Sequence, residues 1–92
     1  MTAILVNYDL VTPGQKYAPL IQQLESYSRW LHVGGSSWIV SGWGLTPASV
    51  RDDLKKILDD NDTLLTIDIT GDAYSGWLTQ ECWDWLKGTV AA

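Results

Sequence analysis

Asp9 is the side chain best placed to do chemistry, because it stands near the end of the first apolar run, Ile4 to Leu10. A carboxylate at the end of a strand can hold a hard cation such as Mg²⁺ together with waters and phosphate oxygens. A symmetric dimer could bring two such carboxylates together, which would raise one pKa. The alternative role is structural, with Asp9 bonding to the backbone of the turn at Thr12-Pro13-Gly14. We expect the structural role and keep Asp9 as the candidate catalytic and metal-binding residue.

The other acidic groups form less specific patterns. Asp68 shares a predicted sheet face with Asp9 and is interpreted as a solvated or interface carboxylate. The cluster Asp59-Asp60-Asn61-Asp62 lacks the glycine and the terminal glutamate of an EF-hand loop. We therefore interpret this cluster as a solvated loop at the end of a helix.

Chemistry that needs histidine or cysteine lacks the necessary partners. His32 is the single histidine and Cys82 the single cysteine, and together they cannot complete the ligand set of a zinc site. A Ser-His-Asp arrangement would have to use His32, which is predicted to lie two strands away from Asp9. We expect Cys82 to be a small core residue. No cofactor is predicted, and Mg²⁺ is expected only if the protein is a nuclease.

The composition limits the class of protein and its partners. Six basic residues stand against eleven acidic ones, for a net charge of −5, whereas nucleic-acid binders usually carry a basic stripe. A hydrophobic content of 46% indicates a globular protein, and no apolar run is long enough to cross a membrane. A single cysteine allows no intrachain disulfide, so we expect a cytoplasmic protein. A chain of 92 residues is predicted to form one domain, residues 1–92.

The apolar patterns and turn residues predict an α+β fold. Gly34-Gly35 suits the turn of a hairpin, and Thr46-Pro47 is a helix cap followed by proline. The order βαββαβ with a short C-terminal helix is typical of a ferredoxin-like domain, with a four-stranded antiparallel sheet of order 4-1-3-2. Strands are predicted at residues 3–10, 30–33, 36–43 and 63–70, and helices from 14 to about 29, from 47 to about 60 and after Thr79.

The alternation of side chains assigns the two faces of this sheet. We pair Tyr8 with Leu65 and Leu31 with Trp38, which makes the helix-covered face apolar. The predicted core is Ile4, Val6, Tyr8, Leu20, Ile21, Leu24, Leu31, Trp38, Val40, Val50, Leu54, Leu58, Leu65, Ile67 and Ile69. The open face is then predicted to carry Asn7, Asp9, Trp30, His32, Ser37, Ile39, Ser41, Trp43, Thr66, Asp68 and Thr70. An aromatic face of this kind is rarely left bare; we favour a homodimer as its cover, over the terminal helix or a ligand.

Several short motifs resemble those of a known family. They are Val6-Asn7-Tyr8-Asp9-Leu10, Pro13-Gly14 with Tyr17, Trp30-Leu31-His32, Ser37-Trp38-Ile39-Val40, Leu64 to Gly71, Gly76-Trp77 and Trp83-Asp84-Trp85-Leu86. Over nearly the whole chain this pattern is similar to the small bacterial and phage proteins called SinR-like, distant relatives of the Cas2 and VapD endoribonuclease-like proteins. The resemblance implies a ferredoxin-like fold, a homodimer that stacks its sheets, and a match of Asp9 to the proposed metal ligand of the Cas2 relatives. The chain departs from those relatives in lacking an exchanged fifth strand and a basic surface.

Three functions stay open at this point. A non-catalytic interaction module, with a possible protein partner, is favoured by the acidic charge and by the resemblance to SinR-like proteins. A Mg²⁺-dependent endoribonuclease would use Asp9 and would need positive charge nearby, for which Lys16 is the local candidate. A single-stranded RNA or nucleotide binder would stack bases on Trp30, His32 and Trp43, but nucleic acid is the less expected partner.

Overall fold

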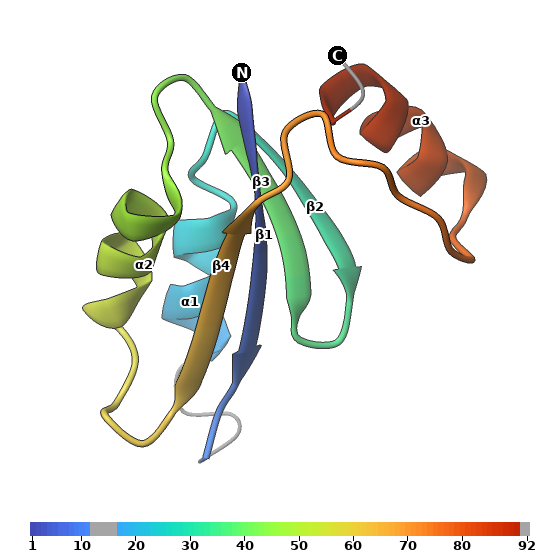
Figure 1. Ribbon diagram of the computed structural model, residues 1–92. Coiled ribbons are helices and arrows are strands. Elements are labelled where there is room, and N and C mark those ends of the chain that lie inside the picture. Colours follow the sequence, from blue (N-terminus) through green and yellow to red (C-terminus); the bar gives the residue numbers. More distant parts are fainter. Residues whose placement is uncertain (12–16, 91–92) are drawn as a thin grey trace.

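The computed structural model describes residues 1–11 and 17–90. The described elements follow the predicted order βαββαβ with a further helix at the end of the chain (Figure 1). They are β1 (Thr2–Asp9), α1 (Tyr17–Leu24), β2 (Arg29–Gly34), β3 (Ser37–Gly42), α2 (Pro47–Lys55), β4 (Thr63–Asp68) and α3 (Gln80–Thr89).

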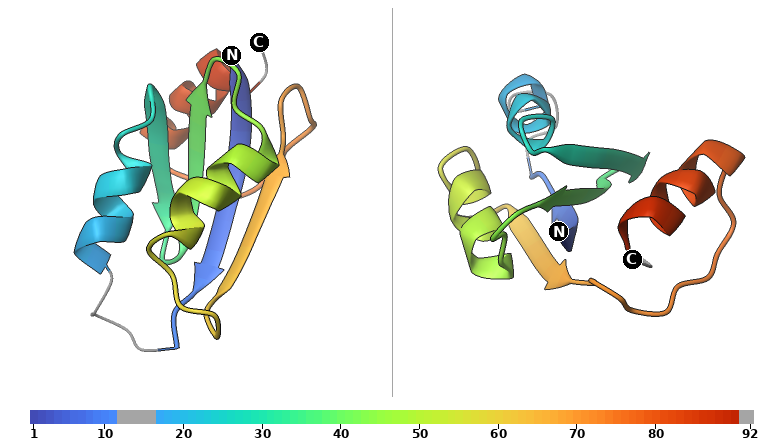
Figure 2. Two further views of the ribbon diagram at one scale, coloured as in Figure 1. Left: turned by 90° about the vertical axis from the view of Figure 1, so that its left-hand side faces the viewer. Right: turned by 90° about the horizontal axis from the view of Figure 1, so that it is seen from above.

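The strands form one four-stranded antiparallel sheet of order β2-β3-β1-β4, which confirms the predicted topology of a ferredoxin-like α+β fold. Figure 2 shows α1 and α2 on one face of the sheet and α3 on the other. We call these the α1/α2 face and the α3 face. None of the helices in the described part of the chain is long and apolar enough to cross a membrane.

The two capped helices begin where their side chains satisfy free backbone N–H groups. At α2, the Thr46 hydroxyl accepts from the Ser49 N–H and the Ser49 hydroxyl accepts from the Thr46 N–H, both at 3.0 Å. This reciprocal pair is a capping box, followed by Pro47 at the first helical position. At α3, the Thr79 hydroxyl accepts from the Cys82 N–H. The predicted cap at Thr46-Pro47 is therefore confirmed, although α2 ends at Lys55, earlier than expected.

The main core lies on the α1/α2 face. Trp38 is its largest fully buried side chain, and its Nε1 donates to the Tyr8 hydroxyl at 3.2 Å. Most of the predicted core is confirmed, with Leu10 and Leu64 as additions. The buried members are Ile4, Val6, Tyr8, Leu10, Leu20, Leu24, Trp38, Val40, Val50 and Leu54, with Ile21, Leu58 and Leu64 among the side chains packed against them.

The register of β4 corrects the sequence prediction by one residue. Tyr8 lies opposite Leu64, not Leu65, and Val6 lies opposite Thr66. A slip of one residue moves every side chain of a strand to the other face, so Leu65, Ile67 and Ile69 leave the predicted core. The doublet Leu64-Leu65 offers an apolar residue in either register. The observed one also lets the Thr66 hydroxyl donate to the Pro47 carbonyl oxygen of α2 at 2.9 Å.

The β2–β3 hairpin is also shifted by one residue from the prediction. His32 lies opposite Trp38 and Leu31 opposite Ile39, with a register irregularity between His32 and Gly34. The positive φ of the turn falls on Gly35, at 45°, because the loop consists of Gly35 and Ser36 and not of Gly34 and Gly35. The prediction that Leu31 joins the main core is therefore wrong.

Candidate functional site

The corrected registers redistribute the residues predicted for the open face. Asn7 and Ile39 do lie on the α3 face, where Asn7 accepts a hydrogen bond from the Ser37 hydroxyl at 2.8 Å. Trp43 follows the end of β3 and is 82% exposed. By register, Trp30, His32, Thr66 and Asp68 belong to the opposite face. The predicted aromatic surface is thus divided between the two sides of the sheet.

Trp30 and His32 form an aromatic group with the core residue Trp38. The His32 and Trp38 rings are stacked, with centroids 4.1 Å apart, and the Trp30 ring is tilted against Trp38 at 5.7 Å. The His32 Nε2 is also 2.8 Å from the Gly35 carbonyl oxygen, which ties the ring to its own hairpin turn. These contacts give His32 a structural role and take two of the three predicted base-stacking residues off the α3 face.

Helix α3 covers part of the face that was predicted to be open. Leu86 and Val90 are buried there against Ala3 and Ile39, and the Gly71 N–H donates to the Val90 carbonyl oxygen at 2.9 Å. The Arg29 guanidinium lies 5.2 Å from the centre of the Trp85 ring, which adds a cation–π contact between β2 and α3. Cys82, predicted to be in the core, is only partly buried.

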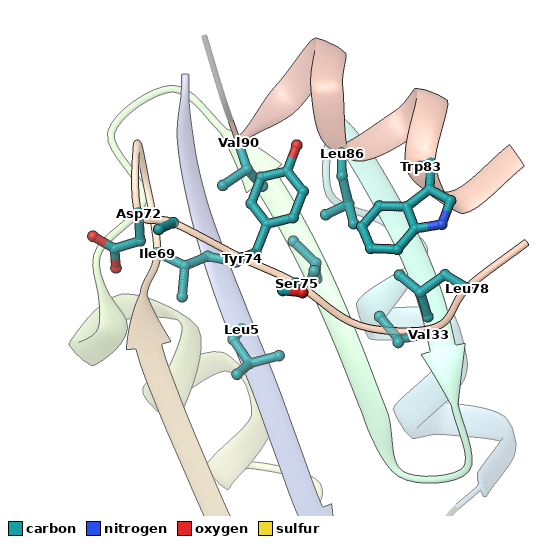
Figure 3. A pocket seen from close by; sticks show the side chains of 12 residues that line it. Leu5, Val33, Ile69, Asp72, Tyr74, Ser75, Leu78, Trp83, Leu86 and Val90 are labelled. Atoms are coloured by element: carbon teal, nitrogen blue, oxygen red, sulfur yellow. The ribbon is translucent and has the colours of Figure 1, made fainter. Parts of the chain in front are cut away.

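A cleft remains between the sheet, α3 and the connector that joins β4 to α3. Its volume is about 290 Å³. Figure 3 shows its walls, with Asp72 and Trp83 at opposite ends. The sheet contributes Leu5, Val33 and Ile39, and the remaining lining residues are Ile69, Asp72, Ala73, Tyr74, Ser75, Leu78, Trp83, Leu86 and Val90. We refer to this space as the α3 cleft.

The lining of the α3 cleft is apolar with a few polar groups. The rings of Tyr74 and Trp83 lie nearly parallel, with centroids 6.1 Å apart and 20° between their planes. Among the described lining residues, Asp72 supplies the one carboxylate and none is a lysine, arginine or histidine. Such a surface suits an uncharged or positively charged ligand with a large apolar part.

The far end of the α3 face carries Asp9, which is exposed and paired with Thr63 of β4. The predicted turn at Thr12-Pro13-Gly14 and the nearby Lys16 lie outside the described residues. Within the described ranges, no group of three or more His, Cys, Asp or Glu side chains could hold a metal ion. The described part of the chain therefore shows no such cluster around Asp9, and its role as a metal ligand stays a prediction.

Two of the other acidic residues have structural partners. The Asp62 carboxylate accepts from the Val11 N–H and from the Asp59 N–H, both at 2.9 Å, so it ties the end of β1 to the loop before β4. Asp68 accepts from the Thr70 N–H at 2.9 Å, and this backbone hydrogen bond lowers the pKa of the exposed Asp68 carboxyl below its usual value. These contacts are those of turn-forming carboxylates.

Hydroxyl groups that are buried or partly buried have hydrogen-bond partners on the α1/α2 face, but two on the α3 face have none in the described structure. On the α1/α2 face, the Tyr27 hydroxyl donates to Asp53 at 2.7 Å, and burial together with this bond raises the pKa of the phenol. Burial also raises the pKa of Tyr8, against the opposing effect of the Trp38 hydrogen bond. Below α3, the hydroxyls of Ser41 and Thr89 are buried without a hydrogen-bond partner in the described structure. The packing of α3 on the sheet is therefore the less complete of the two.

The sequence reasoning missed the cleft because its walls come from the placement of α3. Two signals were present. The predicted strand at 63–70 is followed by Gly71, a residue that often ends regular structure. In the structure Gly71 lies in the irregular segment between β4 and α3 and has a φ of 73°, a conformation that favours glycine. This segment also contains Tyr74 and Trp77, which are too large and apolar for an ordinary solvated linker.

Comparison of the chain with family models, with curated proteins and with solved structures found no match. The similarity to SinR-like proteins therefore stays a prediction from the sequence motifs.

Proposed function

We propose that this protein is a non-catalytic interaction module that forms a homodimer through the outer edge of β4. The observation that carries this proposal is an apolar pair on an edge strand. Leu65 and Ile67 are 56% and 41% exposed, and among the described strands β4 pairs only with β1. Unpaired backbone groups beside exposed apolar side chains are a template for pairing with another strand.

The sequence of β4 lacks the usual features that prevent edge pairing. Its residues, Thr63 to Asp68, include no proline and no lysine, and no bulge interrupts its pairing with β1. The other edge strand, β2, carries Arg29 and a register irregularity next to its turn. Of the two edges, β4 is therefore the better surface for a second copy of the chain.

Backbone directions define how two β4 strands would pair. The Ile69 N–H donates to the Ala3 carbonyl oxygen of β1. Because N–H groups along a strand alternate in direction, those of Ile67 and Leu65 also face β1, and those of Leu64, Thr66 and Asp68 face outward. A two-fold axis at Thr66 then forms an antiparallel hydrogen-bonded pair between the two copies of this residue.

The same register brings the apolar side chains together. With Thr66 on the axis, Leu65 of one protomer lies opposite Ile67 of the other on the α3 face. These are non-hydrogen-bonded positions, where opposed side chains are closest. The result would be one continuous sheet across both protomers, with four apolar side chains meeting at its centre. This arrangement replaces the interface predicted from Trp30, Ile39 and Trp43, since Ile39 is buried under α3 and Trp30 belongs to the other face.

The non-catalytic part of the proposal is supported by the net charge of −5 and by the lack of a cluster of three or more metal-ligating side chains in the described residues. A nuclease would need a metal site and positive charge to hold phosphate. The proposal also includes a SinR-like identity and a cytoplasmic location for this protein. The endoribonuclease is the alternative. It predicts Mg²⁺-dependent cleavage of labelled RNA or DNA that is lost in Asp9→Asn, whereas we expect no cleavage by either protein.

Sedimentation velocity tests the dimer. We expect the wild-type protein to sediment as a dimer at tens of micromolar and Ile67→Lys as a monomer, because each lysine would put a charge opposite Leu65 of the other protomer, inside the apolar contact. Trp77→Lys is the matched control, since Trp77 is 99% exposed and lies outside β4; it should remain dimeric. A wild-type monomer at high micromolar concentration would contradict the proposal.

A further inference from the structure

We propose that the α3 cleft binds a small amphipathic amine, with the apolar body of the ligand inside the cleft and its ammonium group at the Asp72 end. This inference concerns a different surface from the β4 edge, so it does not depend on dimer formation.

The size of the cleft suits one small organic molecule. Its volume of about 290 Å³ lies near the lower limit of small-molecule sites, which measure roughly 300–1,000 Å³. The inner wall consists of Leu5, Val33 and Ile39 from the sheet, facing Leu86 and Val90 from the α3 side. Side chains around an unfilled apolar space lack contact partners. A ligand of matching shape would supply those contacts without displacing any side chain from the main core.

The charges of the cleft select the sign of the ligand. Among the described lining residues, Asp72 is the only carboxylate and no side chain is cationic. Figure 3 draws the Asp72 carboxylate at the rim of the cleft, pointing away from the other lining side chains. It is exposed, and no hydrogen bond or ion pair in the described part of the chain holds it there, so it can turn toward an ammonium group at the mouth of the cleft. The net charge of −5 adds a potential that attracts cations and repels anions. An ammonium ligand is therefore favoured over a carboxylate or a phosphate.

The aromatic residues set the orientation of the ligand. Tyr74 and Trp83 offer nearly parallel rings, against which an apolar or aromatic body can pack. Trp83 lies at the end of the cleft away from Asp72 (Figure 3). A ligand with a ring at one end and an ammonium group at the other can pack its ring near Trp83 and place its ammonium group near Asp72.

Three probes with a common phenyl ring separate charge from shape: 2-phenylethylamine, 2-phenylethanol and 3-phenylpropionate. Each is titrated into the ¹⁵N-labelled full chain up to millimolar concentration, and binding is followed by amide chemical shifts. We expect the amine to bind about tenfold more tightly than the carboxylate, because the exposed Asp72 carboxylate attracts the ammonium of one probe and repels the carboxylate of the other. The alcohol should be intermediate. The largest shifts should fall on Ile39, Tyr74 and Leu86.

Matched variants locate the charge effect. Asp72→Asn should reduce the preference for the amine over the alcohol to within about twofold, since only the charge is removed. Asp84→Asn is the control, because Asp84 is an exposed acid on α3 that does not line the cleft; it should leave the preference unchanged. Both residues are exposed, so neither substitution threatens the fold.

The proposal would be overturned by equal or tighter binding of 3-phenylpropionate, by shifts confined to residues outside the cleft, or by the absence of binding by all three probes. A loss of amine preference in Asp84→Asn that equals the loss in Asp72→Asn would also do so, because it would show a general effect of net charge.

Discussion

The two faces of the same sheet differ in how completely they are closed. On the α1/α2 face, Trp38 is 1% exposed and its indole N–H is bonded to Tyr8. On the α3 face, the cleft persists, and the buried hydroxyls of Ser41 and Thr89 have no partner in the described structure. The first face contains the stabilising core. The second, with its cleft and the Leu65–Ile67 pair, contains the surfaces available for binding.

The cause of the difference lies in the chain connections. Along the chain, α1 lies between β1 and β2, and α2 lies between β3 and β4 (Figure 1). Each of these helices is therefore connected to a strand of the sheet on both sides. Helix α3 follows an irregular connector and is fixed to the sheet mainly by Leu86, Val90 and the Gly71 hydrogen bond. We therefore expect α3 to open locally at a lower free energy than the rest of the fold.

The largest effect should come from the closed face. Trp38→Ala removes the largest fully buried side chain and leaves the Tyr8 hydroxyl without its donor. We expect a loss of about 4 kcal/mol in the free energy of unfolding. Urea denaturation followed by far-ultraviolet circular dichroism measures this loss. A cost below about 2 kcal/mol would mean that this face is not the main core.

A smaller effect is expected on the α3 face. Leu86→Ala removes a buried leucine whose surroundings already include the cleft, so the cost should fall near the lower end of the usual range, about 2 kcal/mol. Hydrogen exchange should show the loss mainly in α3 amides, with β1 and β3 amides keeping their protection. Equal loss of protection in all strands would show that α3 unfolds together with the sheet and is not a separate, weaker layer.

The register of β4 can be tested with a substitution of intermediate effect. Thr66→Val keeps the shape of the side chain but removes its hydrogen bond to the Pro47 carbonyl oxygen, and should cost about 1 kcal/mol. Thr63→Val, at the exposed start of the strand, is the control and should be nearly neutral. If the control costs more than Thr66→Val, the strand has the register that was predicted from the sequence.

The smallest effect concerns acid stability. The native pKa of Asp68 is lowered, chiefly by the Thr70 N–H, so this group stabilises the folded state above its unfolded pKa of 3.8. That contribution is lost as the pH falls through the lower, native value. In acid titrations monitored by circular dichroism, Asp68→Asn should therefore lose less stability than the wild type below about pH 4. Parallel curves for the two proteins would show that Asp68 has no such role.

Much of the fold could be predicted from the sequence because local signals agreed with it. The Thr46-Pro47 cap, the apolar alternation of β1 and the spacing of Val50 and Leu54 each allowed one solution. Registers were harder, because the Leu64-Leu65 doublet and the Gly34-Gly35 pair each allowed two. A shift of one residue then placed Ile67 and Trp30 on the wrong faces.

The candidate sites were predicted less well, for a physical reason. The α3 cleft depends on where one helix docks, and docking is decided by tertiary contacts such as that between Leu86 and Ile39. The sequence allows the terminal helix to cover the open face, but only as the alternative to the favoured homodimer. Asp9 is exposed at the end of β1, but its role as a turn cap or a metal ligand stays a prediction, because the turn at Thr12-Pro13-Gly14 and Lys16 lie outside the described residues.

The most direct test of the proposed function is the exchange rate of one backbone amide, that of Thr66. Its N–H faces the outer edge of β4 and is bonded to the second copy only in the dimer. We predict slow exchange at high protein concentration, faster exchange on dilution, and fast exchange at all concentrations in Ile67→Lys. The Ile67 amide, which faces β1, should stay protected on dilution of the wild-type protein. Fast exchange of the Thr66 amide in the concentrated wild-type protein would contradict the account.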